Sequence, residues 1–122
     1  MKHNKNDLRE MSITFAISVA EVCKDIKGNQ VYKQQIIKSS SSIGANLFEA
    51  KYAQSRADFI NKLEISLKEC SETEYWLEVL FRQSLICEKE YKQLNNVRGT
   101  IQRMLIASIT TAKNNDNKSS KQ

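Results

Sequence analysis

The chain has 122 residues, and 40% of them are hydrophobic, which is enough to fill one core. Its net charge of +5 is compatible with a nucleic-acid partner and equally with an ordinary solvated surface. It has no proline and only three glycines, which argues against an all-β fold because sheets need turns, and it has no apolar run that could span a membrane or act as a secretory signal. Its three cysteines cannot all pair with one another, which favours a reduced, cytoplasmic setting.

The first predicted helix runs from about Asp7 to Lys27. Apolar residues recur along it at helical spacing, and Gly28 then supplies the left-handed position that commonly ends a helix. The connection is short, so a second helix, from Asn29 or Gln30 to Tyr52, should return antiparallel to the first. The main apolar stripe of the first helix comprises Leu8, Phe15, Val19, Val22 and Ile26.

A run of serines, Ser39 to Ser42, lies within the second predicted helix. Because the run has poor helix propensity, a phosphate-binding turn is one interpretation. A P-loop, however, needs a following Gly-Lys-Ser/Thr, and the only glycine nearby is Gly44. We favour a helical layer in which small residues let two helices approach closely and serine hydroxyls bond to the preceding turn. Counting from the tight turn at Ala53 and Gln54 places this run level with Ser66 on the next helix.

The third predicted helix is long and extends from Ser55 to about Leu85. The Ser55 hydroxyl can accept a hydrogen bond from the first turn, and Asp58, three residues later, completes a capping-box pattern. Its main stripe places one carboxylate, Glu74, among apolar residues. The stripe comprises Arg56, Phe59, Leu63, Leu67, Cys70, Glu74, Leu77 and Phe81.

A carboxylate within a core must find a partner or take up a proton. Counting from the helix turns places Arg98 on the fourth helix and Tyr32 on the second helix level with Glu74. We therefore predict a Glu74–Arg98 pair or a hydrogen bond from Tyr32 to Glu74. We interpret this buried polar group as a device that sets helix register rather than as a catalytic residue.

The fourth predicted helix runs from about Glu88 to Ala112. The following segment, 114–122, has no apolar residue, so we expect it to be a disordered polar tail. Together the four elements predict an all-α, antiparallel up-down-up-down four-helix bundle, formed as a single domain by residues 1–113.

The two middle helices each carry a second apolar strip away from the predicted core face. Isolated exposed apolar residues are normal, but strips on adjacent helices indicate an interface, and Trp is favoured at such sites. We therefore predict a homo-oligomer. Its subunits are expected to meet through Ile37, Gly44, Phe48, Ile65, Trp76 and Val79.

The sequence offers little for catalysis or metal binding. Its only histidine is His3, near the N-terminus, so neither the serines nor the cysteines have an evident base, and a bundle di-metal site lacks its histidine ligands. We predict a non-enzymatic protein without a cofactor or metal. The best candidate surface for nucleic-acid phosphates is the solvent face of the fourth helix, with Lys89, Lys92, Asn96 and Arg103.

Two segments, SIGANLFEA (42–50) and SRADFINKLEISLKECSETEYWLEVL (55–80), resemble the four-helix-bundle family of intervening-sequence proteins. That family is named for members encoded inside insertions in bacterial 23S rRNA genes. The resemblance covers roughly residues 7–112. It implies an up-down-up-down bundle, commonly assembled as a homopentamer. Related bundle proteins are accessory factors to the reverse transcriptase of diversity-generating retroelements and bind nucleic acid through a basic surface.

Two functions therefore stay open. The protein is either a nucleic-acid-associated accessory or scaffold factor, with RNA or DNA as a partner, or a structural or protein-interaction module with no nucleic-acid role. Both interpretations are non-enzymatic, and both include self-association.

Overall fold

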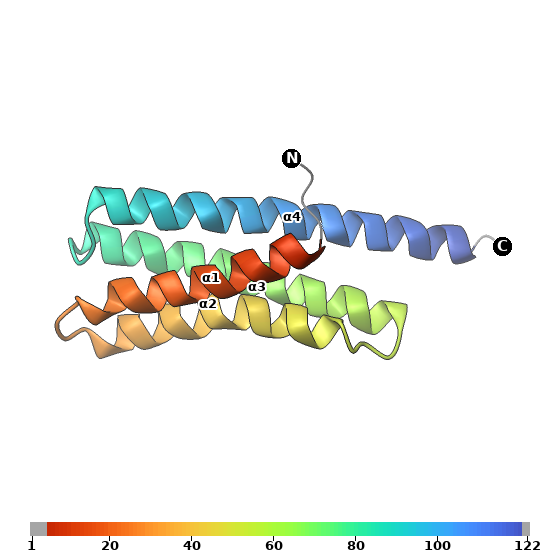
Figure 1. Ribbon diagram of the computed structural model, residues 1–122, viewed down its shortest axis with the longest axis horizontal. Helices are drawn as coiled ribbons and strands as arrows, with labels where there is room; N and C mark the ends of the chain where they lie inside the picture. The colour runs from red at the N-terminus through yellow and green to blue at the C-terminus, as the bar shows by residue number, and fades with distance from the viewer. Residues whose placement is uncertain (1–4, 121–122) are drawn as a thin grey trace.

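The computed structural model describes residues 5–120, with side chains described for 7–115. It contains α1 (Lys5–Lys24), α2 (Gln30–Ala50), α3 (Arg56–Arg82) and α4 (Glu88–Ser120). Successive helices run in opposite directions and lie side by side, and α1 also packs against α4 (Figure 1). The predicted all-α, up-down-up-down four-helix bundle is therefore confirmed.

The turn between α1 and α2 begins earlier than predicted. α1 ends at Lys24 instead of Lys27, and Gly28 and Asn29 both adopt left-handed backbone conformations, with φ of 70° and 53°. The extra loop residues let Ile26 turn back into the core, where it is buried. Lys33 of α2 donates to the Ile26 carbonyl oxygen over 2.9 Å, which fixes this turn against the start of α2.

The turn between α2 and α3 follows the predicted capping pattern. Ser55 is extended, and its hydroxyl accepts a hydrogen bond from the Asp58 backbone N–H over 3.0 Å. The Asp58 carboxylate in turn accepts from the Gln54 backbone N–H over 3.4 Å. These bonds satisfy backbone donors that a helix start leaves without an intrahelical partner.

A cysteine starts the last helix in the place of the usual hydroxyl or carboxylate cap. The Glu90 N–H lies 3.4 Å from Cys87 Sγ, and the Cys87 N–H donates to Glu90 Oε1 over 2.9 Å. The arrangement is a capping box with sulfur as one acceptor.

The far end of α4 differs from the sequence-based expectation. The helix continues past Ala112 to Ser120, so the part of segment 114–122 that the structure describes is helical, where a disordered tail was expected. No glycine or proline follows Gly99, and each residue added to an existing helix gains one backbone hydrogen bond at little further cost. Residues 121 and 122 lie outside the described residues.

The core face of α3 is rotated slightly from the predicted stripe. Leu63, Cys70 and Leu77 are buried as predicted, whereas Leu67 is only half-buried. Small hydroxyl residues take the place next to α2, because their hydroxyls can bond to that helix. The buried residues of α3 are Ile60, Leu63, Ser66, Cys70, Thr73, Leu77 and Leu80.

The serine run forms the close-packed layer between α2 and α3 that its spacing indicates. Ser66 Oγ donates to the Ile43 carbonyl oxygen over 2.8 Å, which links the two helices directly. Thr73 Oγ1 lies 2.8 Å from Ser39 Oγ, and both side chains are fully buried. Ser40 Oγ bonds to the Ile37 carbonyl oxygen in its own helix. The layer is therefore structural, and these hydroxyls are occupied by intrachain bonds.

Candidate functional site

A buried arginine, Arg98, ties α3 to α4. Its guanidinium donates to Glu74 Oε2 over 2.9 Å, to Asn95 Oδ1 over 2.9 Å and to Gln102 Oε1 over 2.7 Å. Cys70 adds its thiol, which donates to the Arg98 carbonyl oxygen over 3.4 Å. Partners surround this charge within one chain, which is the condition under which a buried charge is tolerated.

The predicted Glu74–Arg98 pair is thus present, but the two residues are not equally buried. The Arg98 side chain is 5% exposed and the Glu74 side chain is 55% exposed, so the prediction of a buried Glu74 is wrong. The rotation of α3 explains this result, since it turns Glu74 outward until only its carboxylate reaches the guanidinium. Tyr32, the alternative partner, instead packs its ring against Trp76, with centroids 6.0 Å apart.

The two predicted interface strips lie on different sides of α2. Gly44 faces α1, where a Cβ on it would lie 3.5 Å from Ser12 Cβ, and the Phe48 ring lies 5.7 Å from the Arg9 guanidinium carbon. Trp76 packs instead between Tyr32 and Tyr75 at the α2–α3 side. The structure therefore separates Ile37, Gly44 and Phe48 from Ile65, Trp76 and Val79.

The strip on α2 continues onto α1. Ile13 and Ile17 follow Arg9 at one and two helical turns, so they share the side of α1 that meets Phe48. We call the set Ile13, Ile17, Ile37 and Phe48 the α1–α2 patch. Its side chains are 43%, 57%, 38% and 49% exposed, respectively. The sequence analysis missed the α1 half, because it identified only the core stripe of that helix and assigned Ile13 and Ile17 to no surface.

The strip on α3 is less open. Ile65, Trp76 and Val79 are all half-buried within the single chain. The Trp76 indole N–H is buried and has no hydrogen-bond partner among the described residues. This region is therefore already partly covered by its own bundle.

The predicted phosphate-facing residues of α4 are exposed and lie on one side of the helix. Lys89, Lys92, Asn96 and Arg103 lie within a span of 15 residues, whose ends are about 21 Å apart along the helix at 1.5 Å per residue. Lys92 forms an ion pair with Glu88 over 2.9 Å, which lowers the pKa of that carboxyl group, and Arg103 donates to the Thr100 hydroxyl. Two of the four cationic or polar side chains are therefore partly engaged within α4.

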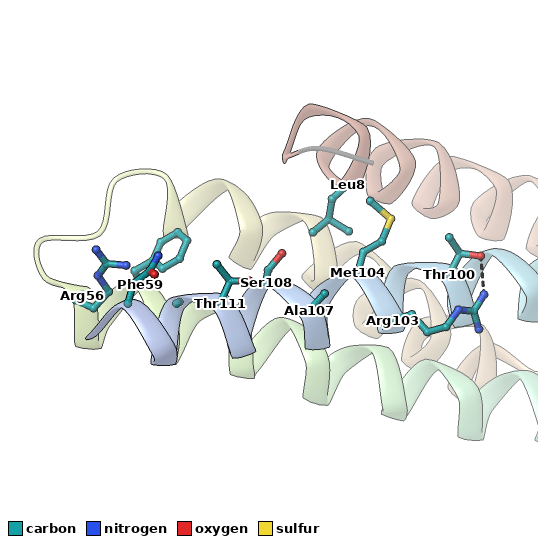
Figure 2. A pocket seen from close by; sticks show the side chains of 11 residues that line it. Leu8, Arg56, Phe59, Thr100, Arg103, Met104, Ala107, Ser108 and Thr111 are labelled. Atoms are coloured by element: carbon teal, nitrogen blue, oxygen red, sulfur yellow. Dashed lines mark hydrogen bonds between the residues drawn. The ribbon is translucent and has the colours of Figure 1, made fainter. Parts of the chain in front are cut away.

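Further basic residues line a groove at the end of the bundle where α1 starts. There, α4 and the α2–α3 turn extend beyond the start of α1 (Figure 1). The groove has a volume of about 810 Å³, and Figure 2 shows Leu8, Arg56, Phe59 and Arg103 at its walls. A second hollow of about 560 Å³ shares Leu8, Arg56, Phe59 and Ser108 with it and reaches Arg9 and Lys51. We call these joined hollows the open-end groove.

The two buried cysteines, Cys23 and Cys70, do not resemble activated nucleophiles. Burial raises the pKa of the Cys23 thiol, and burial likewise raises the pKa of Cys70 although Arg98 opposes the change. A raised pKa reduces the thiolate fraction on which nucleophilic attack depends. Among residues 5–120, no group of three or more potential metal ligands comes together. The sole histidine, His3, lies outside the described residues.

None of the helices within residues 5–120 combines the length and hydropathy that a bilayer span requires. The fold and surfaces thus define an antiparallel helical bundle that exposes an apolar patch and a basic groove. Its sequence matches the 23S rRNA-intervening sequence protein family over residues 4–107, and the chain belongs to that family.

A solved structure supports the same assignment. The chain is similar to a protein of unknown function from the S23 ribosomal protein family of Bacteroides thetaiotaomicron, with 45% identity and a TM-score of 0.82. The match covers 87% of this chain and 97% of that one. Comparison with curated proteins gives no match.

Proposed function

We propose that this protein is a non-enzymatic, self-associating scaffold whose subunits meet through the α1–α2 patch. The observation that carries the proposal is the grouping of four large apolar side chains, each at least 38% exposed, on two adjacent helices. Scattered apolar residues are normal on a surface, but a group of this kind exposes area that association would remove from water.

The close approach of α1 and α2 makes the patch a suitable rigid surface. Gly44 and Ser12 let the helix backbones come together, and Ile13 and Ile17 of α1 are exposed on the helix next to Ile37 and Phe48 of α2. An exposed apolar surface on two packed helices suits a protein–protein contact. A ring of copies, such as the pentamer that the family resemblance implies, needs a second and different patch on each subunit. Ile65, Trp76 and Val79 are our candidates for that second patch.

The experiment compares the masses of variants in sedimentation equilibrium. Ile17→Glu places a charge in the α1–α2 patch and should dissociate the oligomer, because an unpaired charge in an apolar contact is costly. Ile106→Glu is the matched control, since Ile106 is also exposed, at 46%, but lies on α4. Circular dichroism confirms that both variants keep their helices. An Ile17→Glu variant that retains the wild-type mass would exclude this patch as the interface.

Trp76→Glu tests the second patch in the same way. We expect the Trp76→Glu variant to have a lower oligomer mass than the wild type. Because Trp76 is half-buried against Tyr32 and Tyr75, the substitution also disturbs the folded chain. The result therefore counts only if thermal unfolding shows that the bundle is intact.

A second candidate function is nucleic-acid association along α4. It is favoured by the exposure of Lys89, Lys92, Asn96 and Arg103 on one side of a long helix and by the net charge of +5. Such contacts would be independent of sequence and sensitive to salt. Binding of RNA and DNA that falls steeply with salt, and that weakens in Lys89→Glu with Lys92→Glu, would support this role. No binding at low salt would instead favour the interaction module alone.

A cytoplasmic location is part of either proposal and is compatible with the three free cysteines.

A further inference from the structure

Two glutamates interrupt the apolar strip of α3. Ile65, Trp76 and Val79 are half-buried, and Glu69 and Glu72 lie between the first two of them in the sequence. The five positions follow one another at intervals of four, three, four and three residues, so they share one side of the helix. Glu69 is half-buried like its apolar neighbours, whereas Glu72 is exposed. We call these five residues the interrupted α3 strip.

Neither of these carboxyl groups has a basic partner within the described part of the chain. The ion pairs among the described residues include the other three glutamates of α3, but they do not include Glu69 or Glu72. The two carboxyl groups instead hydrogen-bond to each other. Such a bond needs a proton on one of them, because an ionised carboxylate only accepts hydrogen bonds.

The surroundings of Glu69 favour its neutral form. Burial raises the pKa of Glu69, and the charge of Glu72 and the hydrogen bond with it act in the same direction. Two cations oppose the change, Lys38 from the adjacent α2 and Lys68 from α3 itself, but both are exposed and neither forms an ion pair with Glu69. The pair is therefore held by a shared proton rather than by a lysine.

We propose that self-association through the interrupted α3 strip takes up protons at Glu69 and Glu72, so that assembly strengthens as the pH falls. This inference rests on the proposed function, in which another copy of the chain covers Ile65, Trp76 and Val79. A surface that covers those three side chains also removes water from the carboxyl groups between them. Burying a carboxylate without a cation is costly, and protonation avoids that cost.

The direction of the pH effect follows from which state binds more protons. Covering the strip removes water from the pair, which raises the pKa of its carboxyl groups above the values in the single chain. The assembled state therefore binds more protons than the separated chains. Association is strongest below the pKa of the covered pair and weakens as the pH rises through it. Each proton taken up per contact changes the dissociation constant by up to about tenfold per pH unit.

Sedimentation equilibrium of the full-length protein, in a concentration series from about pH 7.5 to about pH 5, measures this effect. We expect the dissociation constant to fall by about tenfold or more toward the acidic end. A dissociation constant that does not change with pH would overturn the proposal. A constant that rises toward acidic pH would also overturn it, because it would show that cations of the second copy meet the ionised carboxylates.

Matched double variants assign the effect to the pair. Glu69→Gln with Glu72→Gln removes both acids and should associate about tenfold more tightly than the wild type at about pH 7.5, with little dependence on pH. Glu64→Gln with Glu78→Gln removes the same charge from exposed positions of α3 that pair with basic side chains outside the strip, and it should keep the wild-type pH dependence. Both double variants keep His3, so its titration affects them equally. Circular dichroism at each pH checks that the helices persist. The proposal fails if the two double variants respond to pH in the same way.

The same measurements distinguish a failure of this proposal from a failure of the proposed function. An oligomer that is insensitive to pH, but whose mass is reduced by Ile17→Glu, would overturn the proton uptake and leave the self-association intact. A mass of 14.0 kDa over the whole pH range would contradict both proposals.

Discussion

The two sides of α2 differ in packing: the side toward α3 is buried within the chain, whereas the side toward α1 leaves apolar side chains exposed. Toward α3, the hydroxyls of Ser39, Ser66 and Thr73 are fully buried and bonded, and the side chains interlock. Toward α1, the backbones approach at Gly44, but Ile37 and Phe48 remain exposed beside Ile13 and Ile17. The first side stabilises the single chain, and the second leaves apolar area that association can bury.

The largest expected effect is on the free energy of unfolding, and it compares the substitution of Ile by Ala at two places on α2. Ile43→Ala removes a fully buried side chain and should destabilise the folded chain by about 2–5 kcal/mol. Ile37→Ala lies one residue beyond Ile36 on the exposed side and should cost less than about 1 kcal/mol of monomer stability. Urea unfolding at a concentration where the protein is monomeric measures both values. Equal losses would contradict the distinction between the two sides.

A second pair of variants compares two arginines of α4. Arg98→Met should destabilise the chain by about 2–4 kcal/mol, because it leaves Asn95 and Gln102 without the partner that they bond in the buried interface. Arg103→Met, five residues later at the groove, should change stability by less than about 0.5 kcal/mol. Thermal and urea unfolding provide the comparison. If Arg103→Met proved as destabilising as Arg98→Met, the exposed arginine would be as much a structural residue as the buried one.

The smallest effect concerns single hydroxyls. Ser66→Ala removes the bond to the Ile43 carbonyl oxygen between two helices and should cost about 1 kcal/mol. Ser42→Ala removes a bond to the Lys38 carbonyl oxygen within one helix, where the serine is only half-buried, and should be close to neutral. Differential scanning calorimetry resolves this difference as a shift in Tm. A neutral Ser66→Ala would show that packing alone holds α2 against α3.

Much of the fold follows from local signals in the sequence. Ser55 with Asp58 marks a helix start, Gly28 marks a turn, and counting outward from the turns places Arg98 level with Glu74. These predictions succeed because they depend on capping chemistry and on helical rise, which vary little with context.

The rest depends on how the helices rotate against one another. A small rotation of α3 exposes Glu74 and brings Thr73 inward, and periodicity alone does not fix such a rotation. The same uncertainty joined Phe48 and Trp76 into one predicted surface, although the structure places them on opposite sides of α2. The open-end groove was not predicted, because it forms where the longer α4 extends beyond the start of α1.

The central claim is that the α1–α2 patch is covered by another copy of the chain. Sedimentation equilibrium of the unmodified protein, over a wide range of concentration, tests it most directly. The account predicts a mass that is a multiple of the 14.0 kDa chain and that Ile17→Glu reduces. A mass of 14.0 kDa at every concentration would contradict it.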